Sequence, residues 1–181
     1  VVAELFKDKK NLSEMEKVRV IYDYILKNIS YSSVTFMQSA LVPKKASQTI
    51  NAKLGDCKDM SVLFVAMAKE LGISANLVLV DSRENGERDL LLPSISFNHC
   101  IARVKVDNKD YFVELTDPKL SFSTIPFYNE NSLCLVIPKE NETFTSDLIY
   151  MNTTNKPENK SIRETNIVFT GNDLTAVRKT Y

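Results

Sequence analysis

A long apolar repeat between residues 56 and 71 limits the fold of this chain more than any other segment. Its apolar side chains recur at spacings of three and four, which places on one helical face Met60, Leu63, Phe64, Met67 and Leu71. Gly72 follows where a helix commonly ends in a left-handed residue. A helix of this kind has to be largely buried, and the strand-like run at residues 75–80 gives it a sheet to pack against. We therefore expect an α+β protein.

Further helices are expected before this segment. Ser13 and Glu16 form a capping-box pattern. A second apolar repeat follows them at helical spacing, made up of Val18, Ile21, Tyr22, Ile25, Leu26 and Ile29. A short helical piece is expected at residues 46–53, after a long loop that begins at Tyr31.

Strands are expected after the buried helix. Residues 100–106 and 111–115 flank the turn-prone residues 107–110, which predicts an antiparallel hairpin. Two more strand-like runs lie at residues 133–137 and 162–170. The expected architecture is therefore helices packed on an antiparallel sheet, with a β extension at the C-terminal side.

The length of the chain allows one main domain. With 181 residues, 44% of them hydrophobic, the chain can bury one substantial core but not two domains of ordinary size. Residues 1–138 hold the predicted helices and most predicted strands, and we take them as the core. Residues 139–181 are expected to form a polar linker and a β extension. That extension either adds a strand to the core or begins a following β domain.

The charge of the chain disfavours two classes of partner. It has 23 basic and 23 acidic residues, so the broad positive field that attracts nucleic acid or anionic membranes is absent. No apolar run approaches the roughly 18 to 20 residues that cross a bilayer. We expect no nucleic-acid partner and no insertion into a membrane.

The cysteines fit neither a disulfide framework nor a metal site. Cys57, Cys100 and Cys134 are an odd number at wide spacings, so at least one thiol is free. Zinc sites usually combine closely spaced cysteines with histidines, and this chain has one histidine in total. We therefore predict no metal.

Cys57 is the first candidate for chemistry. The sequence Gly-Asp-Cys-Lys-Asp at residues 55–59 places it in the first turn of the buried helix, where the positive helix end stabilises a thiolate. Lys58 adds local positive charge, and Gly55 is expected to need a backbone conformation that β-branched residues resist. The alternative is a buried structural cysteine, because free cysteine behaves as a small hydrophobe.

His99, the only histidine, favours the chemical interpretation of Cys57. It is expected at the start of a strand, on a sheet that packs against the helix of Cys57. A thiol nucleophile needs a base that takes its proton and returns it to the leaving group, and an imidazole does both. By itself, a single histidine is more often a hydrogen-bonded structural residue.

Two carboxylates compete to orient the imidazole. Glu114 lies among apolar residues within the second strand of the hairpin, where a charge requires a partner. Asp117 precedes Pro118, and its alternative role is that of a turn residue. We favour Glu114 over Asp117 as the third member of the site.

Three motifs in this order resemble those of the transglutaminase-like superfamily: Gly-Asp-Cys-Lys-Asp at residues 55–59, Asn-His at 98–99 and Glu-Leu-Thr at 114–116. The resemblance covers residues 12–137. It implies a papain-like α+β fold with a Cys-His-Asp triad. Glu114 stands in the place of the family's aspartate. The family's usual tryptophan beside that motif is missing, because the chain has no Trp.

The resemblance implies a cysteine-dependent acyl-transfer enzyme that acts on peptide or carboxamide bonds through a Cys57 thioester. Peptidases, amidases and transglutaminases share that thioester, so the sequence leaves the choice open. The implied substrate is a protein or peptide, and no cofactor is implied. The backbone N–H of Cys57 is one expected oxyanion donor, and Gln38 is a candidate for another.

The resemblance is closest to bacterial envelope-associated members. It implies a periplasmic or cell-envelope location and a longer chain in which β-rich domains adjoin this one. The alternative function is a catalytically inactive binding or scaffolding module that keeps the fold.

Overall fold

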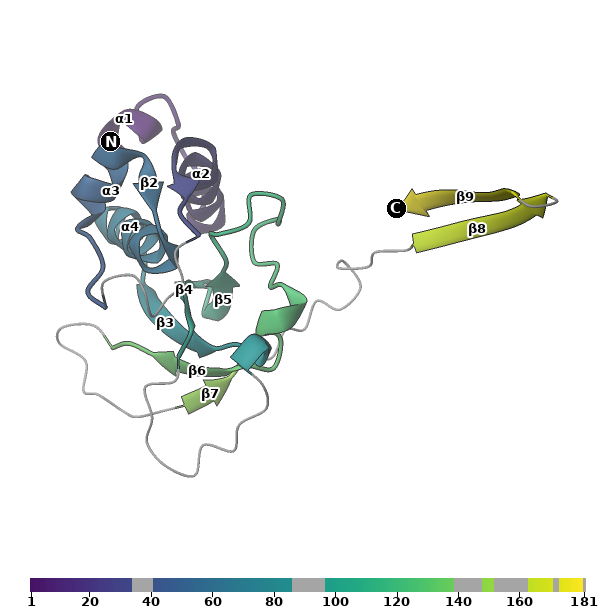
Figure 1. Cartoon of the computed structure of the whole chain (residues 1–181). Helices are drawn as coiled ribbons and strands as arrows, with labels where there is room; N and C mark the ends of the chain where they lie inside the picture. Colours follow the sequence, from purple (N-terminus) through teal and green to yellow (C-terminus); the bar gives the residue numbers. More distant parts are fainter. Residues whose placement is uncertain (34–40, 86–96, 139–147, 152–162, 171–172, 181) are drawn as a thin grey trace.

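The computed structural model describes residues 1–33, 41–85, 97–138, 148–151, 163–170 and 173–180, and it confirms an α+β fold with helices packed on an antiparallel sheet (Figure 1). The helices before the main sheet are α1 (Val2–Phe6), α2 (Glu14–Asn28), α3 (Ala46–Ala52) and α4 (Cys57–Glu70). Single turns of 3₁₀-helix follow later, η1 (Arg83–Asn85) and η2 (Phe127–Asn129).

The main sheet has the strand order β5-β4-β3-β6-β7, and each neighbouring pair is antiparallel. Its strands are β3 (Ala75–Asp81), β4 (His99–Val106), β5 (Lys109–Val113), β6 (Leu133–Val136) and β7 (Leu148–Tyr150). The strands predicted at 75–80, 100–106 and 133–137 are confirmed to within one residue. β7 was not predicted, because a strand of three residues has too little alternation to recognise.

The predicted hairpin is formed by β4 and β5, but β5 lies two residues earlier than expected. Asp107 and Asn108 form a two-residue turn in which both have positive φ, 50° and 60°. Such a turn matches the twist of the flanking strands and lets pairing begin at Lys109. The expectation of a strand at 111–115 is therefore corrected, and Glu114 follows the end of β5.

The core has two parts, one on each face of the sheet. On one face α2 and α4 pack against β3, β4 and β5, and Phe64 and Leu63 of α4 are completely buried. Burying side chains of this size contributes about 1.5–3 kcal/mol each. The opposite face carries a smaller cluster that includes Val78, Ile101 and Met151.

The ends of the two long helices follow their sequence signals. Ser13 caps α2, and its side chain and that of Glu16 exchange hydrogen bonds with each other's backbone N–H groups. Gly72 has a φ of +74°, and it ends α4 with hydrogen bonds from Gly72 to Lys69 and from Ile73 to Ala68. The two long helices and both predicted caps are confirmed, and the short helix predicted at residues 46–53 is present as α3.

A two-residue parallel pairing connects the end of α2 to the start of α4. β1 (Ser30–Tyr31) pairs with β2 (Leu54–Gly55), and Tyr31 is the partner of Gly55. The expectation that Gly55 has an unusual backbone conformation is wrong, because Gly72 is the glycine with positive φ among those described. Gly55 is needed for space instead. A Cβ there would lie 2.9 Å from Asp59 Cβ and 3.0 Å from Thr49 Cγ2.

The strand predicted at residues 162–170 is present as β8 (Arg163–Thr170). It forms an antiparallel two-stranded sheet with β9 (Asp173–Thr180), which was not predicted. Among the described residues these two strands pair with each other and not with the main sheet. The division into a core at 1–138 and an extension at 139–181 stays a prediction.

Candidate active site

Cys57 is the first residue of α4, and the residue before it determines where the helix begins. The Asp56 carboxylate accepts hydrogen bonds from the backbone N–H groups of Lys58 at 2.9 Å and Asp59 at 3.0 Å. This cap fixes the first turn and places the Cys57 thiol at the positive end of the helix dipole. Cys57 is buried, with 4% of its surface exposed.

The charged residues around Cys57 form two ion pairs. Lys58 Nζ lies 2.7 Å from Asp56 Oδ2, and both side chains are buried. Lys44 Nζ lies 2.9 Å from Asp59 Oδ2, and the Lys44 backbone N–H also donates to Asp59. Because Asp56 balances the charge of Lys58, Lys58 adds less positive charge beside Cys57 than the sequence suggested.

His99 is the first residue of β4, one of the strands against which α4 packs. Ser61 Oγ of α4 donates to the Cys100 carbonyl at 3.2 Å, which joins α4 to the residue after His99. His99 Nε2 lies 2.8 Å from Glu114 Oε2. The Cys57 side chain lies close enough to the imidazole to be among the groups that raise the pKa of His99.

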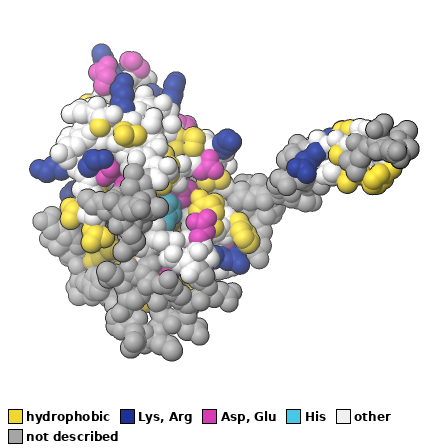
Figure 2. Space-filling view, in the orientation of Figure 1, with side chains coloured by type: hydrophobic (Ala, Val, Ile, Leu, Met, Phe, Trp, Pro, Cys, Tyr) yellow, Lys and Arg dark blue, Asp and Glu magenta, His cyan; other side chains and the backbone are white. Residues whose placement is uncertain are grey.

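The surroundings of His99 favour the imidazolium ion. Burial alone would lower its pKa, but the Glu114 carboxylate and the hydrogen bonds with Cys57 and Glu114 raise the pKa of His99 from 6.5 to about 10. The His99 side chain is 13% exposed. Figure 2 shows the single histidine at the molecular surface, next to hydrophobic side chains. A bound molecule can therefore reach the imidazole.

The Glu114 carboxylate is almost completely buried, and five hydrogen bonds hold it. Oε1 accepts from the backbone N–H groups of Leu115 and Thr116, both at 2.9 Å, and from Thr116 Oγ1 at 2.7 Å. Oε2 takes part in the bond with His99 and accepts from Asn129 Nδ2 at 3.1 Å. Burial would raise the pKa of Glu114, but His99 and Thr116 lower it below its usual value. The carboxylate is therefore ionised opposite the imidazolium.

Asp117 differs from these three residues in its surroundings. Asp117 Oδ1 accepts the backbone N–H of Lys119 at 2.9 Å, in the manner of a turn residue. Of the two competing carboxylates, the structure thus brings Glu114 to the imidazole. Gln38, the candidate oxyanion donor, lies outside the described residues.

Three residues near the site were not anticipated from the sequence: Tyr31, Tyr128 and Asn129. Burial and the negative charges of Cys57 and Glu114 raise the pKa of Tyr31 to about 12. Burial and Glu114 likewise raise the pKa of Tyr128 to about 12. These influences indicate that both phenols lie near the site. Tyr31 belongs to a two-residue strand and Tyr128 to a single 3₁₀ turn, and neither element has a recognisable sequence period.

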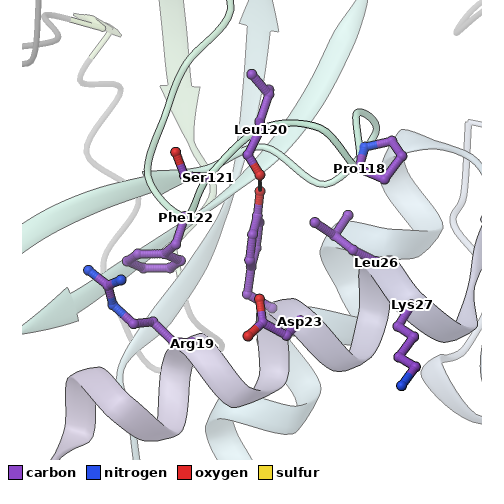
Figure 3. A pocket seen from close by; sticks show the side chains of 9 residues that line it. Arg19, Asp23, Leu26, Lys27, Pro118, Leu120, Ser121 and Phe122 are labelled. Atoms are coloured by element: carbon purple, nitrogen blue, oxygen red, sulfur yellow. Dashed lines mark hydrogen bonds between the residues drawn. The ribbon is translucent and has the colours of Figure 1, made fainter. Parts of the chain in front are cut away.

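A separate pocket of about 420 Å³ lies between α2 and residues 118–122, the segment that follows Glu114 (Figure 3). The Tyr22 hydroxyl donates to the Leu120 carbonyl at 2.9 Å, and the Tyr22 ring packs edge-on against Phe122 with 5.6 Å between centroids. The Arg19 guanidinium lies over the Phe122 ring, 5.5 Å from the ring centroid. These contacts anchor the chain just beyond Glu114 to α2.

The described residues contain no group of three or more His, Cys, Asp or Glu side chains that could hold a metal ion. None of the described helices has the length and apolar character of a membrane-spanning segment.

Comparison with known proteins identifies a family and a fold. The family model described as the transglutaminase-like superfamily matches residues 2–115. Among solved structures, a proposed protease from Parabacteroides distasonis ATCC 8503 is 19% identical, with a TM-score of 0.63 over 84% of this chain. At that identity the similarity shows the fold alone. No curated protein matches the chain.

The chain spans 27% of the length of the Parabacteroides distasonis protein. A proposed cysteine protease from Cytophaga hutchinsonii is 22% identical, with a TM-score of 0.46; the match covers 64% of this chain and 35% of that protein.

Proposed function

This chain belongs to the transglutaminase-like superfamily, and we propose that it is a cysteine-dependent acyl-transfer enzyme that acts on peptide or carboxamide bonds through a thioester on Cys57. The family and the fold support a cysteine-type enzyme in general. One observation carries the finer proposal. The imidazole of His99 lies 2.8 Å from a buried, ionised Glu114, and the Cys57 side chain is among the groups that raise the pKa of His99.

In the first half of the reaction, the Cys57 thiolate attacks the carbonyl carbon and forms the carbon–sulfur bond. The oxygen of the tetrahedral intermediate carries the negative charge, and the backbone N–H of Cys57 is suited to stabilise it. The His99 imidazolium then donates its proton to the leaving nitrogen as the carbon–nitrogen bond breaks. Ammonia or an amine leaves, and the acyl group stays on Cys57.

The charge of Cys57 affects how readily His99 gives up this proton. The thiolate and its hydrogen bond are among the influences that raise the pKa of His99. When sulfur becomes bonded to the acyl carbon, its negative charge is lost and the pKa of His99 falls. The imidazolium therefore becomes a better acid at the step that needs one.

In the second half, neutral His99 takes a proton from the incoming nucleophile, which attacks the thioester and releases Cys57. Water as nucleophile gives hydrolysis, and a primary amine gives transamidation. Glu114 holds the imidazole in one tautomer and stabilises its cation in both halves. We propose a protein or peptide substrate, because the superfamily acts on such bonds.

The proposal is tested by trapping the thioester. Glutamine-containing peptides are incubated with the protein, with and without a primary amine such as glycine ethyl ester, and the intact mass of the protein is measured. We expect an acyl adduct on Cys57 in wild type. Cys57→Ser should form no adduct and keep its melting temperature, because a serine hydroxyl is hardly ionised at neutral pH and has nearly the size of a thiol.

Cys134→Ala is the matched control, because Cys134 is buried on the opposite face of the sheet. It should leave the adduct in place. An adduct that persists in Cys57→Ser would show that Cys57 is not the nucleophile. If Cys57 in wild type reacts with iodoacetamide no faster than an ordinary exposed thiol at mildly acidic pH, a binding or scaffolding module becomes the better interpretation.

A further inference from the structure

Asn129 joins the site from a part of the chain that the family match does not reach. It is the last residue of η2, it is completely buried, and the match ends at residue 115. Asn129 Nδ2 donates to Glu114 Oε2 at 3.1 Å, the same oxygen that lies 2.8 Å from His99 Nε2. One carboxylate oxygen is thus shared by the imidazole and by an amide from a distant segment.

The chemistry of Glu114 determines which way the Asn129 amide points. An ionised carboxylate can only accept hydrogen bonds, so the amide must present its NH₂ group to Oε2. Asn129 Oδ1 then points away from Glu114, and it is buried without a hydrogen-bond partner among the described residues. A buried acceptor without a partner is costly. The bond to Glu114 therefore holds the Asn129 amide in an orientation that leaves Asn129 Oδ1 without a hydrogen bond.

The two oxygens of Glu114 are held by different parts of the chain. Oε1 is bound by Leu115 and Thr116, the two residues that follow it. These bonds fix the position of Oε1, but they leave the carboxylate able to rotate about Oε1, which would move Oε2. Asn129 supplies a donor to Oε2 from outside this segment, and its backbone is itself held by the bond from Asn129 N–H to the Pro126 carbonyl at 2.9 Å.

We propose that Asn129 is a positioning residue of the site, which holds Glu114 Oε2 in line with His99 Nε2 and keeps Glu114 ionised. This inference rests on the proposed function, because it assigns Asn129 a role in the Cys57–His99–Glu114 arrangement. Asn129 acts through Glu114.

The test measures how fast iodoacetamide alkylates Cys57 over a range of pH, followed by mass spectrometry of the Cys57 peptide in the full chain. Asn129→Ala removes the donor, so Glu114 binds a proton more readily and loses its hold on the imidazolium. We expect alkylation at mildly acidic pH to slow by roughly tenfold, as for the loss of a hydrogen bond to a charged group. The acidic limb of the rate profile should also move to higher pH.

Asn129→Asp separates positioning from simple packing. A second carboxylate beside Glu114 shares one proton with it, so at mildly acidic pH the protonated Asp donates where the amide did. We expect alkylation near the wild-type rate there, roughly tenfold faster than in Asn129→Ala. Because burial raises the pKa of the introduced carboxyl, the melting temperature of this variant should fall as the pH rises and the proton is lost.

Ser132→Ala is the matched control, because Ser132 is buried in the same segment and bonds to the Tyr128 carbonyl instead of Glu114. Its rate profile should equal that of wild type. Wild-type rates in Asn129→Ala, or equal slowing in Asn129→Ala, Asn129→Asp and Ser132→Ala, would overturn the inference.

A measurement on the unmodified protein tests the inference even if the variants do not fold. In an acid titration followed by NMR, the Asn129 side-chain amide signals should shift as Glu114 takes up its proton, and signals that stay constant would reject the inference. This outcome is distinct from failure of the proposed function. An unreactive wild-type Cys57 would contradict acyl transfer, whereas a reactive Cys57 with unchanged Asn129 variants would contradict only the role of Asn129.

Discussion

Glu114 has one more rotatable bond than the aspartate of the superfamily motif, so its carboxylate needs more contacts to keep one orientation. Five hydrogen bonds supply them, and Glu114 as a residue is 1% exposed. Thr116 contributes two of these bonds, through its backbone and its hydroxyl. The Glu-Leu-Thr motif therefore compensates locally for the longer side chain, and Asn129 completes the arrangement.

Glu114→Gln should lower the acylation rate by about one to several orders of magnitude, because a neutral amide does not stabilise the imidazolium or fix its tautomer. Asp117→Asn should have a small effect, since Asp117 bonds to Lys119 in a turn. Single-turnover formation of the Cys57 thioester measures both. The reverse ranking would assign the acid to Asp117 and leave the Cys57–His99 pair in place.

The His99–Glu114 pair also predicts how stability depends on pH. The pKa of His99 is raised from 6.5 to about 10 in the folded protein, so its contribution to stability is fully present below about 6.5 and is lost as pH rises toward 10. The pKa of Glu114 is lowered, so its contribution is present above about 4.5 and is lost at more acidic pH. The difference in melting temperature between wild type and His99→Gln should therefore shrink from pH 6.5 to pH 10. A constant difference over that range would contradict the raised pKa.

At the scale of secondary-structure elements, sequence patterns could predict the helices that have an apolar repeat and a capping residue. α2 and α4 have apolar repeats, and Ser13 and Gly72 mark their ends. The same patterns placed Cys57 and His99 at element starts, but they placed Glu114 inside a strand that ends one residue before it. The β1–β2 pairing and η2 could not be predicted, because two- and three-residue elements are fixed by tertiary contacts. Tyr31 and Asn129 were missed for this reason.

The β1–β2 pairing makes Gly55 a test of how the fold supports the site. In Gly55→Ala the new methyl group would lie 2.9 Å from Asp59 Cβ, so the first turn of α4 would have to shift. We expect a loss of about 1–3 kcal/mol in the free energy of unfolding. Alkylation of Cys57 should also slow, because the cap and the thiol move together.

Gly72→Ala is the matched control for this change. Nothing lies within 4 Å of a Cβ at Gly72, but its φ of +74° strains any side chain, which costs about 1 kcal/mol. Its melting temperature should fall while Cys57 reacts at the wild-type rate. Equal rates of alkylation in wild type and Gly55→Ala would show that the first turn of α4 tolerates the methyl group.

At the scale of the whole molecule, the main sheet continues beyond residue 138, where the sequence placed the end of the core. β7 pairs with β6, and Met151 is completely buried against the second face of the sheet. Met151 also exchanges backbone hydrogen bonds with the segment after η2, from Asn131 to Met151 at 3.0 Å and from Met151 to Ser132 at 2.9 Å. These contacts link residues after 138 to the segment that carries Asn129.

Two truncated chains locate the end of the core. A chain of residues 1–151 keeps β7 and Met151, whereas a chain of residues 1–138 loses the β6–β7 hydrogen bonds and the burial of Met151. Burial of a methionine alone contributes about 1.5–3 kcal/mol, so the shorter chain should unfold at clearly lower denaturant concentration. Because Asn131 and Ser132 lose their partner, η2 should loosen and Cys57 should react more slowly with iodoacetamide. If both chains unfold at the same denaturant concentration with equal thiol reactivity, the core ends at residue 138 and the strand that follows supports neither the fold nor the site.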